Sequence, residues 1–392
     1  MSKGRAVILF VLIAADFLFI NYPGVKIILY AGVLLILFSR VYTMIVKANI
    51  SIERKSMNSI LFTGLNDESV LTAANKSIIP FHALLISDYA DLRVSDKQSH
   101  IFLGSVGGGE KKDFTFTLYG RKRGKYSIGP TRVTFTDCLG LFSFMEEIKT
   151  VRDVIVLPRI YKIPQPGFKS LQPQGVIKNS VPIYEDPSII TGVREYENGD
   201  DIKKINWKIS ARHSRFYINT YQHSISSNSM VLLNLSDRDL DYREKEFYAG
   251  RLIEVCASLF NELYAIKQSF SLVSNGSRDG SGQALITPSG KSENHFISIL
   301  TDLALIEPGK DIPLSSLFGS LKSIRWGLSV YLITTRIDKE SLSFLMDLRR
   351  RGHSVSIIYA GPELRIDMSF WNIGFQTFYA EWKDDLINLN RL

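Results

Sequence analysis

The stretch Met230-Val231-Leu232-Leu233-Asn234-Leu235 decides the fold of the C-terminal half, because a short, continuous apolar run is typical of a buried strand. Similar runs follow at 269–273, 329–334 and 354–359, and helix-like segments stand at Arg243–Gln268 and Lys339–Arg351. Alternating strands and helices predict a largely parallel sheet with helices on both faces. We therefore expect an α/β domain over residues 189–392, with function at the carboxyl ends of its strands.

The hydrophobic pattern of the preceding region differs from that of the C-terminal half. Runs such as 81–86, 114–119 and 132–135 are short and β-rich, and clusters of Asn, Asp, Gly and Pro separate them. They predict an antiparallel β-sandwich of immunoglobulin type over residues 48–160. A Pro- and Gly-rich linker, 161–188, is expected between the two domains.

The N-terminal residues predict a membrane anchor. Apolar runs cover Ala6–Ile20 and Val25–Val46, and Asn21-Tyr22-Pro23-Gly24 between them has turn chemistry. We therefore expect a two-helix anchor over residues 1–47, with residues 6–46 in contact with inner-membrane lipid. Asp16 interrupts the first run, and it is either a functional intramembrane acid or a structural one.

The basic residues around these runs predict the topology. They are Lys3, Arg5, Arg40, Lys47, Arg54 and Lys55. Under the positive-inside rule this distribution places both ends of a multi-pass protein in the cytosol. The two cysteines, Cys138 and Cys256, are far apart in sequence, which agrees with a reducing compartment.

The composition excludes several protein classes. With 45% hydrophobic residues among 392 and a net charge of +8, the chain is neither disordered nor strongly basic. We expect no nucleic-acid partner, because the basic run 121–123 lacks interleaved stacking aromatics. That run either meets anionic lipid headgroups or is a solvated loop held off the membrane.

Two motifs carry a more specific signal. One reads Arg123-Gly124-Lys125-Tyr126-Ser127-Ile128-Gly129-Pro130, followed by Asp137-Cys138-Leu139-Gly140-Leu141-Phe142. The other comprises Arg194-Glu195-Tyr196, Gly199-Asp200-Asp201, Ile205-Asn206-Trp207-Lys208 and Ser210-Ala211-Arg212. Both resemble the domain-of-unknown-function 58 (DUF58) family of bacterial membrane proteins.

The resemblance implies an architecture and a partner. In that family the second soluble domain looks like a von Willebrand factor A domain, which would describe residues 189–392. Family members are often encoded beside MoxR-type AAA+ ATPases, so an ATPase of this type is the implied partner.

The second motif has two interpretations. Asp200 or Asp201 can cap a helix that docks through Ile202, Ile205 and Ile209. In the structural interpretation Trp207 packs in the core and Glu195 pairs internally with an arginine such as Arg212. In the functional interpretation the motif is a partner surface. Its candidate residues are Arg194, Glu195, Tyr196, Gly199, Asp200, Trp207, Ser210 and Arg212.

The metal site that such domains commonly carry is degenerate here. The resemblance implies Asp-x-Ser-x-Ser at the end of the first strand, but the chain reads Asn234-Leu235-Ser236-Asp237-Arg238. An amide replaces the leading carboxylate and an arginine replaces the second serine, which disfavours a hard cation. We expect no bound metal, with Asn234 and Ser236 as the degenerate candidates.

Other enzymatic motifs are excluded because their residues lack the required spacing or structural context. The stretch 287–292 ends like a phosphate loop, but Leu285 stands where its first glycine is required. The glycines of 104–109 lie among antiparallel strands, and the six histidines have no paired ligand spacing. We expect no catalytic residues and no cofactor.

These observations predict a non-enzymatic, membrane-anchored cytoplasmic adaptor or scaffold that binds a protein partner. The alternative is a metal-dependent ligand-binding protein or enzyme that uses the degenerate site at Asn234 and Ser236.

Overall fold

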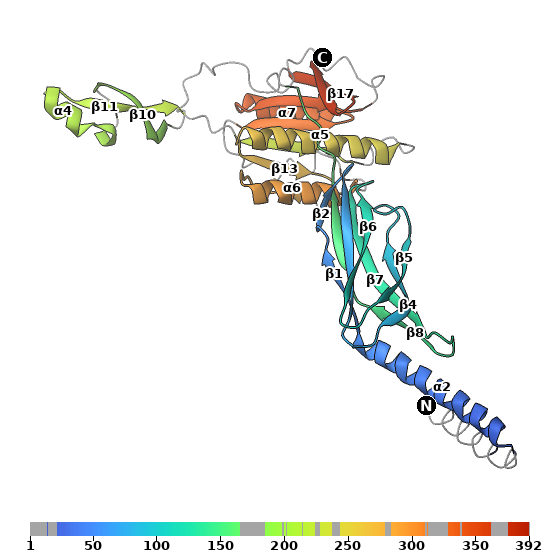
Figure 1. Cartoon of the computed structure of the whole chain (residues 1–392). Helices are drawn as coiled ribbons and strands as arrows, with labels where there is room; N and C mark the ends of the chain where they lie inside the picture. Colours follow the sequence, from blue (N-terminus) through green and yellow to red (C-terminus); the bar gives the residue numbers. More distant parts are fainter. Residues whose placement is uncertain are drawn as a thin grey trace. The chain divides into compact units, whose positions relative to one another are not determined.

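The computed structural model of the chain divides into two compact units, Met1–Arg159 and Ile160–Leu392 (Figure 1). The residues that it describes are 14, 22–164, 185–197, 200, 202–213, 215–223, 228–236, 244–278, 284–309, 312, 328–337, 339–361 and 375–391. Asp16, all but residue 14 of the first predicted span, and most of the predicted linker lie outside them.

The first unit opens with an apolar helix, α2 (Pro23–Asn49). Pro23 suits the first helical turn, where a backbone N–H has no partner within the helix. The helix ends at Ile50, whose extended backbone begins strand β1. Within the described part of the chain, α2 alone is long and apolar enough to cross a membrane, so the predicted two-span, multi-pass anchor is not supported there.

A region built of short strands follows α2 and confirms the β-rich region that the sequence predicts there. Its strands form a three-stranded sheet, β1-β3-β6, and a second sheet, β2-β9-β7-β4-β5, in which β8 also pairs with β7. Neighbouring strands are antiparallel except β2 and β9. The strands are β1 (Ile50–Ser56), β2 (Ile60–Phe62), β3 (Asn66–Asn75), β4 (Phe81–Ala90), β5 (Ser99–Val106), β6 (Lys111–Tyr119), β7 (Gly124–Thr136), β8 (Ser143–Ile148) and β9 (Arg152–Leu157).

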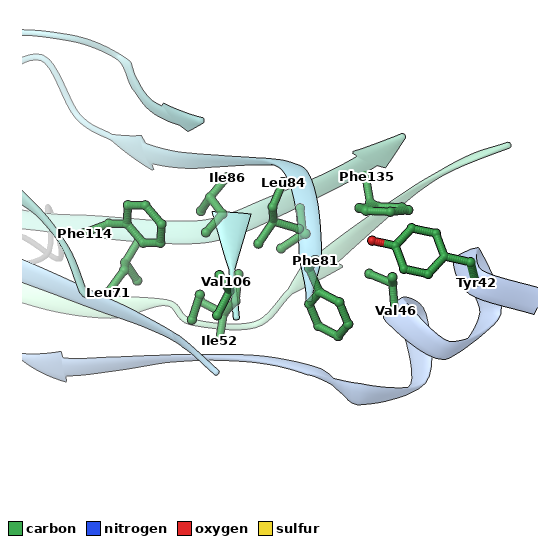
Figure 2. Packing of buried hydrophobic residues seen from close by; sticks show 12 residues of the cluster. Tyr42, Val46, Ile52, Leu71, Phe81, Leu84, Ile86, Val106, Phe114 and Phe135 are labelled. Carbon is green, nitrogen blue, oxygen red and sulfur yellow. The ribbon is translucent and has the colours of Figure 1, made fainter. Parts of the chain in front are cut away.

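The two sheets share a core that also receives α2. Leu71 and Phe114 from one sheet pack in the same cluster as Ile86 from the other. Figure 2 shows Tyr42 and Val46 of α2 reaching into this cluster, where the Tyr42 ring meets Phe135 edge-on at 5.6 Å. The C-terminal turns of α2 are therefore part of the sandwich core. The immunoglobulin type of the sandwich stays a prediction.

The second unit contains the expected parallel sheet. Its strand order is β14-β13-β12-β15-β16-β17-β18, in which β13, β12, β15, β16 and β17 run parallel and the outer two pair antiparallel. The strands are β12 (Ser229–Leu233), β13 (Phe270–Ser274), β14 (Leu285–Ile286), β15 (Ser329–Thr334), β16 (Ser354–Tyr359), β17 (Gln376–Lys383) and β18 (Leu386–Arg391).

Helices cover both faces of this sheet. Helix α7 (Lys339–Arg350) buries Leu345 and Leu348 in a cluster with Leu232 of β12. Helices α5 (Lys245–Ala265) and α6 (Glu293–Leu305) pack on the other face. There the ring centres of Phe260 of α5 and Phe270 of β13 are 5.1 Å apart. The predicted strands and both predicted helices are confirmed. Strands β14, β17 and β18 were not predicted, because none of them carries a strong apolar run.

Candidate functional site

The second motif forms a small substructure of its own. Strands β10 (Glu185–Glu195) and β11 (Tyr217–His223) pair as an antiparallel ribbon, and the segment between them holds a 3-10 turn, η1 (Ile202–Lys204), and helix α4 (Trp207–His213). Asn206 begins α4, since its side-chain oxygen accepts from the N–H of Ile209 at 3.1 Å. Buried Ser210 ties α4 to the ribbon by accepting from the N–H of Tyr217 at 2.9 Å.

Two ion pairs order the motif at its surface. The Arg194 guanidinium donates to both carboxylate oxygens of Asp200 at 2.8 and 2.6 Å, and Asp200 also accepts from the N–H of Glu197. The bond from Arg194, followed by that N–H, lowers the pKa of Asp200. Glu195 pairs with Arg215 at 3.1 Å. The charges therefore link the end of β10 to Asp200 and Arg215.

An exposed aromatic cluster lies beside these charges. Trp207 is 64% exposed and meets the ring of Phe216, itself 56% exposed, edge-on at 6.2 Å. Phe216 also meets half-buried Tyr196 at 6.4 Å. We call Tyr196, Trp207 and Phe216 the aromatic cluster. Large apolar rings at this exposure are free to contact another surface.

The structure corrects three expectations for this motif. Trp207 is not core packing, because it projects from the first turn of a short helix into solvent. Asp200 does not cap a helix, because its carboxylate is engaged by Arg194 and Asn206 caps α4. Asp201, the other predicted cap, lies outside the described residues. Glu195 pairs with Arg215 rather than Arg212, which is exposed on α4. Gly199 lies outside the described residues.

A second polar site stands at the carboxyl ends of the parallel strands. After β12 the chain continues into α5, and after β15 into α7 on the opposite face, so the strand order reverses between β12 and β15. Open α/β sheets bind ligands at such a switch point. Here the buried Asn234 amide donates to the Thr334 hydroxyl at 3.0 Å and so joins the two strand ends.

Asn275, at the end of β13, completes this buried network. Its amide donates to the Asn234 oxygen at 2.8 Å and its own oxygen accepts from the N–H of Leu235 at 2.6 Å. The Asn234 oxygen accepts from the N–H of Ser236 as well. The Ser236 hydroxyl is buried and makes no hydrogen bond within the described part of the chain.

These residues do not fit a divalent cation. The Asn234 oxygen already accepts two hydrogen bonds, and its amide nitrogen, a donor, faces the Thr334 hydroxyl. A hard cation selects carboxylate and free carbonyl oxygens. No group of three His, Cys, Asp or Glu side chains among the described residues could hold a metal ion. Asp237 lies outside them.

The sandwich motif performs a structural role. The Tyr126 hydroxyl donates to the carbonyls of Lys122 and Arg123 at 2.9 and 3.0 Å and closes the turn into β7. Gly129, before Pro130, has φ +94°, and a Cβ there would lie 3.1 Å from the Thr150 carbonyl. Further along the motif, Asp137 and Gly140 shape the turn between β7 and β8, and Gly124 opens β7 at φ +146°.

The basic run 121–123 lies at the end of the sandwich remote from α2. It precedes Gly124 at the start of β7, whereas α2 packs near Phe135 at the other end of that strand. A strand of this length spans about 40 Å, at about 3.3 Å per residue. This position favours a solvated loop over contact with lipid headgroups.

Sequence reasoning missed a buried ion pair. Arg54, which the positive-inside argument counts as a topology signal, instead donates to both Asp88 oxygens inside the sandwich at 3.0 and 2.9 Å. Thr131 donates to Asp88 as well, at 2.7 Å. Asn275 and Phe216 were also missed as site residues, because no local pattern shows that they meet Asn234 and Trp207.

Comparisons with known proteins bear on this second unit. Residues 192–358 match the family model "Protein of unknown function DUF58". The chain is 25% identical over 194 residues to the uncharacterized protein YeaD of Bacillus subtilis, a match that covers 49% of this chain and 45% of that protein. The chain thus spans about half the length of this curated relative.

Solved structures give weaker likenesses. The CARDB domain of the PF1109 protein from Pyrococcus furiosus is 18% identical, with a TM-score of 0.21, covering 28% of this chain and 88% of that one. Proximal thread matrix protein 1 of the mussel byssus is 13% identical, with a TM-score of 0.26, covering 34% and 38%. Scores this low do not define the fold, so the relationship rests on the sequence. Residues 192–358 therefore match the DUF58 family, as the second motif predicts, whereas the sandwich motif lies outside the matched residues.

Proposed function

We propose that this protein is a non-enzymatic adaptor, anchored to the membrane by its N-terminal segment, whose second unit binds a protein partner. The observation that carries the proposal is the exposure of Trp207 and Phe216 beside the Arg194–Asp200 ion pair. Trp, Tyr and Arg dominate the energetically important positions of protein interfaces. An aromatic centre with a polar rim is the composition that such interfaces share.

Both soluble units face the cytosol in this proposal. The anchor includes α2, and Lys47 follows its apolar part, on the side where the positive-inside rule places basic residues. The resemblance to DUF58 proteins supplies the partner class, a MoxR-type AAA+ ATPase. A von Willebrand factor A-like identity for the second unit belongs to the same proposal, and the parallel sheet with antiparallel edges supports it.

The test measures binding between the detergent-solubilised full chain and a purified MoxR-type ATPase from the same organism. Trp207→Ala and Phe216→Ala should each weaken capture at least about tenfold, since a loss of about 1.4 kcal/mol suffices. Phe247→Ala removes another exposed aromatic, on α5, and should leave capture unchanged. If the Trp207→Ala, Phe216→Ala double variant captures the ATPase as well as the parent does, the aromatic cluster is not part of the interface.

The competing function is a ligand site at the switch point. The observation that favours it is the buried hydroxyl of Ser236, which has no hydrogen-bond partner among the described residues. Calorimetric titration of the chain with magnesium, manganese and calcium tests it directly. Binding that disappears in Ser236→Ala would favour a metal-dependent protein over an adaptor, whereas a flat titration agrees with the poor fit of Asn234 to a cation.

A further inference from the structure

The turn between β7 and β8 is fixed against the anchor helix. The Ser39 hydroxyl of α2 donates to the Asp137 carboxylate, and the Arg40 guanidinium lies 5.8 Å from the centre of the Phe142 ring. Asp137 also accepts from the N–H of Phe142 at 3.0 Å, and Gly140 makes the turn at φ +70°. The position of this turn along the helix is therefore defined: it lies level with Ser39 and Arg40.

The tip of this turn is uncharged and exposed. It consists of Cys138, Leu139, Gly140 and Leu141, and the two leucines are 50% and 52% exposed. The loop between β3 and β4 also contacts α2, because the Pro80 carbonyl accepts from the Tyr42 hydroxyl at 2.8 Å. That loop carries Ile78, which is 95% exposed.

The length of α2 sets the level of the membrane surface. Its segment before Ser39, Pro23–Phe38, has no buried side chain and measures about 24 Å at about 1.5 Å per residue. The hydrocarbon core is about 30 Å thick, so a span that begins near Pro23 reaches its far boundary beyond Ser39. The turn that carries Leu139 and Leu141 is level with Ser39 and Arg40, a few ångströms short of that boundary. Arg40 follows Ser39 directly and Lys47 lies about two turns further along α2. Long basic side chains at such positions reach headgroups.

We propose that the sandwich makes a second contact with the bilayer, in which Leu139 and Leu141 enter the lipid interface beside α2, with Ile78 nearby. The proposal rests on the membrane anchoring proposed above. We expect lipid to cover the Leu139–Leu141 tip, because this apolar tip continues the lipid-facing surface of α2. The contact would restrict the tilt of α2 and the sandwich relative to the bilayer.

The chain offers a native probe position. Cys138 is exposed at the tip and Cys256 is buried, so a polarity-sensitive maleimide fluorophore reaches Cys138 selectively. The full chain is reconstituted into vesicles of phosphatidylethanolamine and phosphatidylglycerol, with and without brominated acyl chains. The matched control carries Leu92→Cys in a Cys138→Ser background: Leu92 is 54% exposed and lies after β4, at the end of the sandwich remote from α2.

We expect the Cys138 probe to shift its emission to the blue on reconstitution and to be quenched by brominated lipid, while the Leu92→Cys probe does neither. Leu139→Asp with Leu141→Asp should abolish the shift and the quenching at Cys138. A Cys138 probe that emits as in water, on protein that cofractionates with vesicles, would overturn the proposal and leave the anchor intact. Protein that fails to cofractionate would overturn the anchor itself, and the second contact with it.

Discussion

At the scale of single residues, Arg54 and Asp88 form an ion pair inside the sandwich. Both side chains are almost fully buried, and removing one partner strands a charge away from water. Asp88→Asn should therefore lower the free energy of unfolding by about 3–5 kcal/mol. Chemical denaturation of the detergent-solubilised chain measures this. Asp91→Asn, which breaks the exposed pair with Arg93, should cost less than about 1 kcal/mol.

A buried histidine makes the second unit sensitive to acid. His353 accepts from the N–H of Leu328 through Nδ1 at 3.3 Å, which requires a neutral ring. Burial, and then Arg351, lower the pKa of His353 below its ordinary value of 6.5. The unfolded chain therefore binds this proton more readily, so its stabilising contribution is complete above about pH 6.5 and is lost as the pH falls through the folded pKa.

Thermal unfolding at neutral and mildly acidic pH measures this loss. The melting temperature should fall on acidification, and the fall should be smaller in His353→Asn. His100 of the sandwich, whose pKa burial also lowers, contributes in the same direction. The matched control, His213→Asn, changes an exposed ring and should keep the parent's pH dependence. An equal fall in His353→Asn and parent would contradict the assignment.

At the scale of elements, substitutions in the β10–β11 ribbon and α4 distinguish residues that stabilise the fold from residues that bind the partner. Trp207→Ala should change the free energy of unfolding by less than about 1 kcal/mol, because the ring is mostly exposed. Ser210→Ala leaves the Tyr217 N–H without its acceptor and should cost about 1–3 kcal/mol. Amide hydrogen exchange of the ribbon distinguishes them: exchange should quicken in Ser210→Ala only. Rapid exchange in Trp207→Ala would show that the ring is structural.

At the scale of the whole molecule, the topology of the anchor decides what both units can reach. Reporter fusions after Lys47 and at Leu392 should show cytosolic activity only. A fusion after Tyr22, between the two apolar runs, should be periplasmic if the run 6–20 crosses the membrane. Periplasmic activity after Lys47 would contradict the proposed orientation and move the partner surface outside the cytosol.

The sequence by itself determined the elements with strong periodicity. The apolar run of α2, the alternating strands around Phe114–Tyr119 and the buried strands β12, β13, β15 and β16 follow from local pattern, because burial of one face or of both leaves a direct trace in the residue types. The second motif is equally local, and it predicts the family match over residues 192–358.

Only the tertiary structure decided which residues meet. The hydrogen bond between Asn234 and Thr334 joins positions that are a hundred residues apart, and the Arg54–Asp88 pair joins two sheets. The sequence left two interpretations of Trp207 open, core packing and partner surface, and the structure shows a mostly exposed ring. Its exposure depends on where α4 begins and on how Ser210 ties it to β11. Such contacts leave no local pattern, since their energy is set by the geometry of distant segments.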